Sequence, residues 1–67
     1  MKVQYDEKAD AVYLRFDDSN IIESEEVHPG IILDFNQQNE VVGVEILHLK
    51  QRIPHANLTE MKFEVAK

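Results

Sequence analysis

The 67-residue sequence has no cysteine and no tryptophan, and only two glycines and two prolines. Without cysteine, neither a disulfide nor a cysteine-ligated zinc site can stabilise the chain. The glycines are too few for a phosphate-binding loop, and no serine stands in a Gly-x-Ser-x-Gly motif. No hydrophobic run reaches the roughly 20 residues of a membrane-spanning helix. These absences argue against disulfide-rich, P-loop, serine-hydrolase and membrane-spanning proteins.

The residues that are present describe one small folded unit. Hydrophobic residues make up 43% and charged residues 30% of the chain, which is too apolar for a disordered protein. A chain of this size buries only about 60% of its unfolded surface, which is too little for a deep enzyme cleft. We therefore expect a single domain over residues 1–67 with no catalytic activity. A partner chain is the usual source of the missing stability, so we also expect a homodimer.

The acidic charge is unevenly placed along the chain. Residues 1–48 carry a net charge of −8, whereas residues 49–67 carry +2. An acidic body repels phosphate groups, so nucleic-acid binding is not expected, whereas a basic protein partner would suit it. The simpler alternative is that the charge only keeps the protein soluble. The first ten residues have no apolar core of signal-peptide length, so we expect a cytoplasmic protein without membrane contact.

Hydrophobic and polar residues alternate in several short stretches, which is the pattern of half-buried strands. The expected strands are residues 2–6, 11–16, 21–27, 31–35 and 41–46. Turn-forming residues separate them at 6–10, 17–20, 29–30 and 36–40. The glutamate-rich stretch 21–27 is typical of a sheet edge, where charge deters unwanted pairing. Gly43 permits a bulge or the close approach of another backbone.

The pattern changes after residue 46. One short helical turn is expected near residues 48–53, because Pro54 ends whatever precedes it. In the segment 54–67, the alternation of Met61, Phe63 and Val65 favours a last strand, although a helix would also group Leu58 with Met61 and Val65. The predicted fold is mainly β, α+β at most: a small antiparallel β-meander of four to six strands with one helical turn.

A single sheet of this kind would leave its apolar side open to water. Val12, Leu14 and Phe16 share that side, and we take Phe16 as a core residue whose replacement by alanine costs roughly 3–5 kcal/mol. Either the sheet curls on itself or a second subunit covers it. The second possibility strengthens the expectation of a dimer, with the terminal strand as an exchanged element.

Three blocks of sequence resemble a known family. They are residues 3–16 (VQYDEKADAVYLRF), 23–35 (ESEEVHPGIILDF) and 41–47 (VVGVEIL). In order and spacing they resemble the domain of unknown function 2283 family, the YuzE-like small prokaryotic proteins. The resemblance covers a core of about residues 3–53 and leaves 54–67 as an extension; His28 stands where the family commonly has an acid. It implies no activity, cofactor or catalytic residues, but an antitoxin-like role beside a small toxin-like protein.

Candidate chemical sites are few. The histidines are His28, His48 and His55, and His28 has glutamates nearby that could complete a metal site. Glu23 and Glu25 share one strand face while Glu26 lies on the other, so no metal or other cofactor is expected. The pairs Asp6/Asp10 and Asp17/Asp18 lie in predicted turns, where solvated carboxylates have ordinary pKa values and hold the turns instead of catalysing.

The strongest functional prediction is a surface for a protein partner. Its residues are the acidic strand Glu23, Glu25 and Glu26, together with the basic residues Lys50 and Arg52. An edge strand can receive a partner's strand by β-augmentation, although a charged edge also serves simply to prevent aggregation. The alternative function is a small ligand- or metal-binding protein or minor enzyme. Its pocket would lie at a dimer interface and be built from Tyr5, Tyr13, Asp10 and His48.

Overall fold

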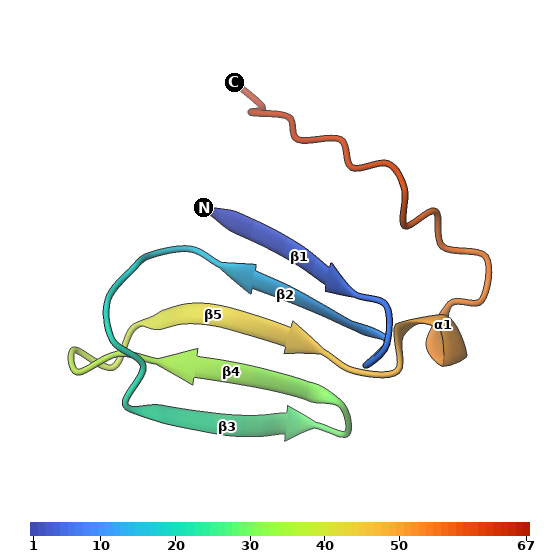
Figure 1. The fold of residues 1–67 in the computed structure, drawn as a ribbon. Coiled ribbons are helices and arrows are strands. Elements are labelled where there is room, and N and C mark those ends of the chain that lie inside the picture. The colour runs from blue at the N-terminus through green and yellow to red at the C-terminus, as the bar shows by residue number, and fades with distance from the viewer.

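The computed structural model describes residues 1–67 and contains one five-stranded sheet and one helical turn (Figure 1). The elements are β1 (Lys2–Asp6), β2 (Ala11–Arg15), β3 (Glu23–His28), β4 (Ile31–Phe35), β5 (Val41–Ile46) and α1 (Leu49–Arg52). The prediction of a mainly β fold with a helical turn near residues 48–53 is confirmed. Pro29 and Gly30 form the turn between β3 and β4, where Gly30 has a φ of 81°. The helix of four residues is far too short to cross a bilayer.

The strands are all antiparallel and follow the order β1-β2-β5-β4-β3. Only β3, β4 and β5 form an uninterrupted meander, because β2 pairs with β5 instead of β3. The connection between β2 and β3 carries the chain to the far edge of the sheet. It is attached at both ends, since Phe16 N donates to Val42 O at 2.8 Å and Ile22 N donates to Phe35 O at 2.9 Å.

Gly43 marks an irregularity in the middle of the sheet. The register of β4 and β5 shifts between Asp34 and Phe35, so that Val42 is an extra residue on β5. Gly43 lies opposite Asp34, and a Cβ at this position would stand 2.8 Å from the Asp34 Oδ2. The bulge therefore lies beside Gly43, and the group that approaches this glycine most closely is a side chain and not another backbone.

The sheet has two chemically different faces. The register aligns Val3, Leu14, Val44 and Leu33 across one face and Gln4, Tyr13, Glu45 and Ile32 across the other. By strand alternation, the apolar face consists of Val3, Tyr5, Val12, Leu14, Ile31, Leu33, Phe35, Val44 and Ile46. The polar face consists of Gln4, Asp6, Tyr13, Arg15, Ser24, Glu26, Ile32, Asp34, Gly43 and Glu45.

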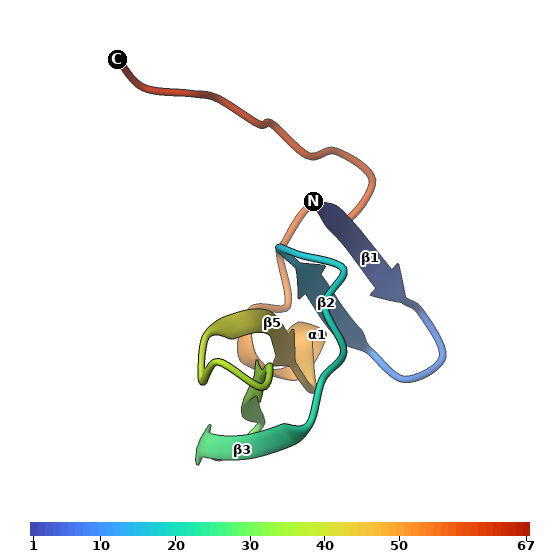
Figure 2. The ribbon, with the colours of Figure 1, turned by 90° about the vertical axis from the view of Figure 1, so that its left-hand side faces the viewer.

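No second layer covers the apolar face, and Figure 2 shows the sheet as a single layer. Val42 is the only large hydrophobic side chain that is buried, and the Cα radius of gyration is 12.9 Å. A compact chain of this length would have a radius of about 11 Å. Phe16 is 44% exposed, so the prediction that it lies in a core is wrong. Its side is open because the chain has no element to place over it.

The chain beyond β5 is attached through Leu47, whose N–H donates to Gly30 O at 2.8 Å, and through α1. Asp10 accepts hydrogen bonds from two α1 backbone groups: its carbonyl from Leu49 N at 3.0 Å, and its carboxylate from Lys50 N at 3.0 Å. Residues 53–67, the tail, form turns and extended chain, and the strand predicted within 54–67 does not form. No backbone hydrogen bond joins residues 57–67 to the sheet, and both views show the tail leaving it (Figures 1 and 2).

Candidate functional site

Strand β3 is an open and acidic edge of the sheet. It is the last strand in the sheet order, and all six of its residues are exposed. Glu23 and Glu25 lie beside the apolar face, while Glu26 belongs to the polar face. We call these three glutamates the acidic edge. The prediction that they lie on an edge strand is confirmed.

The charges of the acidic edge have no basic partner within the chain. The one ion pair of the structure joins Lys62 Nζ and Glu60 Oε1 at 3.5 Å, within the tail. Arg15 is engaged elsewhere, because its Nε donates to Asp17 O at 2.7 Å and its Nη1 donates to the Tyr13 hydroxyl at 3.3 Å. The edge therefore presents unpaired backbone groups and uncompensated negative charge together.

The two basic residues predicted to bind a partner lie on α1, with different surroundings. Arg52 Nε donates to Leu47 O at 3.0 Å, and its guanidinium also donates to Pro29 O in the turn after β3. Arg52 thus ties α1 to the turn that follows the acidic edge. Lys50 is exposed, and only its backbone N–H is used, by Asp10.

The polar face contains a buried carboxylate that the sequence pattern did not reveal. Asp34 is 2% exposed; its Oδ1 accepts a 2.6 Å hydrogen bond from Ser24 Oγ, and its Oδ2 has no partner. Loss of hydration and the nearby Asp34 charge raise the pKa of Glu45 on the adjacent strand. Within Ile31–Phe35, Asp34 was simply a polar residue in an alternating strand. The only available signal was Gly43 on the neighbouring strand.

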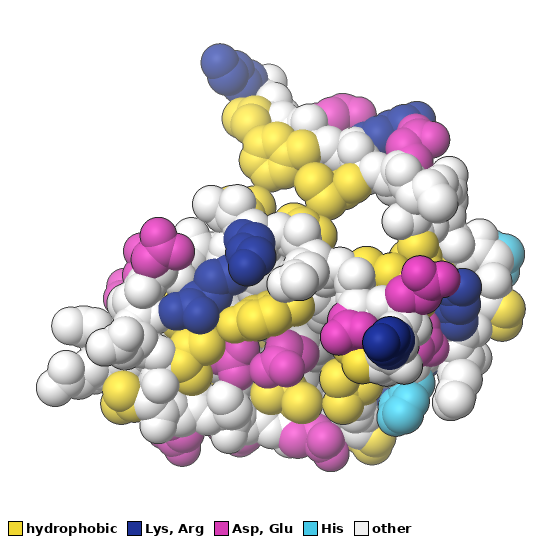
Figure 3. All heavy atoms as spheres, in the orientation of Figure 1, with side chains coloured by type: hydrophobic (Ala, Val, Ile, Leu, Met, Phe, Trp, Pro, Cys, Tyr) yellow, Lys and Arg dark blue, Asp and Glu magenta, His cyan; other side chains and the backbone are white.

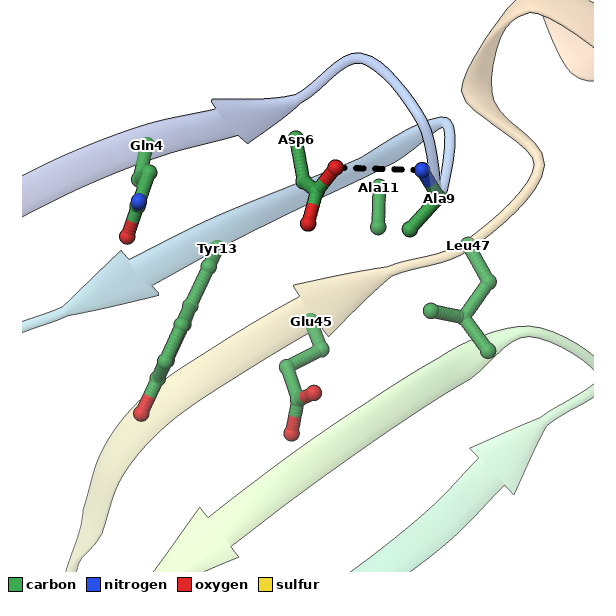
Figure 4. A pocket seen from close by; sticks show the side chains of 7 residues that line it. All are labelled: Gln4, Asp6, Ala9, Ala11, Tyr13, Glu45 and Leu47. Atoms are coloured by element: carbon green, nitrogen blue, oxygen red, sulfur yellow. Dashed lines mark hydrogen bonds between the residues drawn. The ribbon is translucent and has the colours of Figure 1, made fainter.

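A shallow hollow lies on the polar face between β1, β2 and β5, and Figure 4 shows its side chains. Its volume is about 270 Å³, and it is lined by Gln4, Asp6, Ala9, Ala11, Tyr13, Glu45 and Leu47. Asp6 also holds the β1–β2 turn, because its Oδ1 accepts from Ala9 N at 3.1 Å. Acidic side chains stand in the middle of this face in Figure 3. The hollow therefore combines a largely apolar lining with the carboxylates of Asp6 and Glu45.

Within a single chain, Tyr5, Tyr13, Asp10 and His48, the residues predicted to build a pocket at a dimer interface, do not lie together. The Tyr5 hydroxyl donates to Asp10 Oδ1 at 2.9 Å, but Tyr13 lies on the opposite face of the sheet. Loss of hydration acts against ionisation of Asp10, but hydrogen bonds from Lys50 N and Tyr5 outweigh it and lower the pKa of Asp10. His48 is exposed at the start of α1. Asp10 therefore has a structural role, which is to anchor α1.

The three histidines lie on three different segments of the chain. His28 ends β3, His48 precedes α1 and His55 lies in the tail. No group of three or more His, Asp or Glu side chains is arranged so that it could hold a metal ion.

Comparison with known families agrees with the residues that form the sheet. The family described as "Protein of unknown function (DUF2283)" matches residues 2–50. The chain belongs to this family. The match includes all five strands of this DUF2283 protein and leaves residues 51–67, which contain the tail, outside it. No curated protein and no solved structure matches the chain.

Proposed function

We propose that this DUF2283 protein is a non-catalytic interaction module that binds a basic protein through its acidic edge. The observation that carries the proposal is the combination found on β3: a fully exposed edge strand whose three glutamates have no basic partner. An open edge offers backbone hydrogen bonds to an added strand, and the flanking side chains select which strand is accepted. Glutamates on the edge select lysine and arginine.

The shape of β3 limits where a partner strand would lie. The β3–β4 register shifts between Glu26 and His28, so Val27 interrupts the regular ladder. Such a bulge bends its strand and increases the local twist. The regular part is Glu23–Glu26, and a partner strand of about four residues would extend the sheet there. Its basic side chains would meet Glu23 and Glu25 on one side and Glu26 on the other.

The most specific form of the proposal is an antitoxin-like role. A small basic toxin would meet both requirements of the acidic edge, an available strand and positive charge. The support for this form is the charge of the edge and the family resemblance. Like-charge repulsion would also keep the acidic edges of two copies apart, which favours binding of the basic partner over self-pairing.

The test uses an acetylated ten-residue peptide of alternating lysine and valine, added to the ¹⁵N-labelled full chain. We expect the largest NMR shift changes at the amides of Glu23–Glu26. The triple variant Glu23→Gln, Glu25→Gln, Glu26→Gln should bind at least ~10-fold more weakly, because close charge pairs contribute substantially to association. The matched control Glu7→Gln, Asp18→Asn, Glu64→Gln removes the same charge elsewhere and should bind nearly as well as the original chain.

Two results would count against the proposal. Equal weakening by the two triple variants would show that net charge alone attracts the peptide. Unchanged binding by the β3 variant, accompanied by aggregation, would show that the glutamates only protect a free edge. A natural basic partner would support the proposal if it co-purifies with the original chain and the control but not with the β3 variant.

A second candidate function is supported by the carboxyls of Asp34 and Glu45. The buried Asp34 Oδ2 has no partner, and Glu45 extends into the 270 Å³ hollow without a basic neighbour. A small cationic amine in the hollow would offset the repulsion between the Asp34 and Glu45 carboxylates. Addition of 1,4-diaminobutane should then lower the pKa of Glu45, which can be measured by NMR of its side-chain carboxyl carbon. A pKa that stays unchanged at saturating amine would exclude this candidate.

A further inference from the structure

The chain exposes more surface than a compact protein of its mass. Its accessible surface is 5457 Å² for 7.8 kDa, whereas a compact monomer of this mass exposes about 4,400 Å². The excess is about 1,100 Å². A stable protein interface buries about 800 Å² on each partner. The surplus surface is therefore large enough for a complete interface.

The apolar face carries no charge and is only partly covered by the chain. All its residues are hydrophobic or tyrosine, and none of them is fully buried. Leu14, Val44 and Leu33 lie at its centre on neighbouring strands. The acids on this side lie at its margins, Asp10 beside the Tyr5 hydroxyl and Glu23 and Glu25 at the β3 edge, where they would form a polar rim. An uncharged centre with a polar rim is the composition of a protein interface.

No other part of the chain covers this face. Helix α1 has four residues, and none of them is buried. A basic partner would gain nothing electrostatically from an uncharged surface. A second copy offers a surface of the same extent and chemistry, and its acidic groups would remain outside the contact. Two sheets packed face to face form the two layers that a stable β domain needs.

We infer that two copies of this chain form a dimer with their apolar faces packed together and with Met61 and Phe63 of the tails inside the contact. Met61 and Phe63 are 62% and 65% exposed. With Met1 and Val3 they line an open hollow of about 450 Å³ beside β1. The apolar side of the tail thus lies next to the β1 end of the apolar face, but no contact closes the space between them. A second copy would fill it.

This inference is independent of the proposed function. The acidic edge lies at the rim in a face-to-face dimer, so a basic strand can still reach it. Loss of peptide binding with an intact dimer would affect only the proposed function. A monomer that still binds the peptide would overturn only the dimer.

The first test is the mass of the full chain in solution, by sedimentation equilibrium over a concentration series. We expect twice the chain mass of 7.8 kDa at micromolar concentration. In a sample of mixed labelled and unlabelled chains, intermolecular NOEs should connect the methyl groups of Leu14 and Leu33 with the partner copy. A monomer at all concentrations would overturn the inference, as would a dimer without these NOEs or a different protein bound to this face.

Two neighbouring residues of β4 provide matched variants. Leu33→Lys places a charge in the centre of the apolar face, where Glu25 is close enough to help the monomer fold, whereas Ile32→Lys places it on the polar face among acids. Leu33→Lys should raise the dimer Kd at least ~100-fold, because the dimer would have to bury a charged group away from water at the centre of the contact. Ile32→Lys should change it less than ~3-fold. Equal effects would contradict the assigned face.

A tail variant avoids any question of folding, because residues 57–67 make no backbone hydrogen bond with the sheet. Phe63→Ser should raise the dimer Kd about 10-fold through loss of buried aromatic surface. Thr59→Ala is its control in the tail and should leave the Kd unchanged. If Phe63→Ser also left it unchanged, the tail would lie outside the contact.

Discussion

The two faces of the sheet differ in how well a single chain buries and hydrogen-bonds their side chains. On the polar face, Asp34 is 2% exposed and is hydrogen-bonded to Ser24. On the apolar face, no side chain is fully buried. The most deeply buried side chain of the sheet is thus a carboxylate, and the single chain builds no hydrophobic core on the apolar face. The polar face is thus organised within one chain, whereas the apolar face depends on something outside the chain.

The physical cause is the way each kind of contact is made. A carboxylate such as that of Asp34 is buried by its immediate neighbours, because Gly43 leaves space beside it and Ser24 supplies a donor. An extended apolar surface is buried only by another extended surface, and outside the sheet the chain forms only α1 and the extended tail. Substitutions on the two faces should therefore respond differently to protein concentration.

The largest effect is expected for Gly43→Ala on the polar face. The new Cβ would lie 2.8 Å from Asp34 Oδ2 and 3.4 Å from Leu14 O, so the buried carboxylate must move. We expect a loss of about 2 kcal/mol in the free energy of unfolding, measured by urea denaturation. Because the clash lies within one chain, the loss should not depend on protein concentration.

A double-mutant cycle identifies the cause of that loss. Combined with Asp34→Ala, which removes the clashing carboxylate, Gly43→Ala should cost about 1–2 kcal/mol less than it does alone. Additive losses would mean that the glycine is needed for the backbone of the bulge, and that the close approach of Asp34 has little energetic weight.

Phe16→Ala, on the apolar side, should have a smaller effect than its sequence suggested. Phe16 is 44% exposed, so in dilute solution we expect a loss of about 1.5 kcal/mol instead of the 3–5 kcal/mol of a core phenylalanine. In chemical denaturation the loss should grow with protein concentration, because a dimer that covers this side buries more of Phe16. A full core-sized loss at the lowest concentration would contradict the open face.

The sequence predicts the features that depend on local pattern, but not those that depend on pairing between distant segments. The strands Ile31–Phe35 and Val41–Ile46 were found because each has a clear alternation between turn-forming residues. The sheet order was not, since residues 16–22 can serve either as a hairpin loop or as a connection to the far edge. The buried contact of Asp34 with Gly43 depends on register, which pattern does not give. The segment 54–67 alternates like a strand but pairs with no edge of the sheet. Its alternation shows which residues share an apolar side, but it does not determine whether the segment forms a strand.

The smallest expected effect is that of Glu45→Gln, and it depends on pH. The folded state raises the pKa of Glu45, so ionisation of Glu45 destabilises the fold. The free energy of unfolding of the original chain should therefore fall as the pH rises from the ordinary glutamate pKa through the raised value. A glutamine stays neutral and its Nε2 can donate to the unpartnered Asp34 Oδ2. At neutral pH the variant should be more stable by about 1 kcal/mol.

The difference in the free energy of unfolding between Glu45→Gln and the original chain reports on the Glu45 carboxyl alone. Hydrogen bonds from Ser19 lower the pKa of Asp17, and those from Lys50 and Tyr5 lower that of Asp10 despite its lost hydration, so both stabilise the fold above their ordinary pKa values and lose that contribution in acid. Their contributions cancel between the two proteins. The stability difference, from urea denaturation across pH, should shrink toward zero below the ordinary glutamate pKa, where Glu45 is protonated in both the folded and the unfolded state. A stability difference that does not change with pH would mean that the Asp34 and Glu45 carboxyls do not interact. The polar face would then lack the internal electrostatic coupling that distinguishes it from the apolar face.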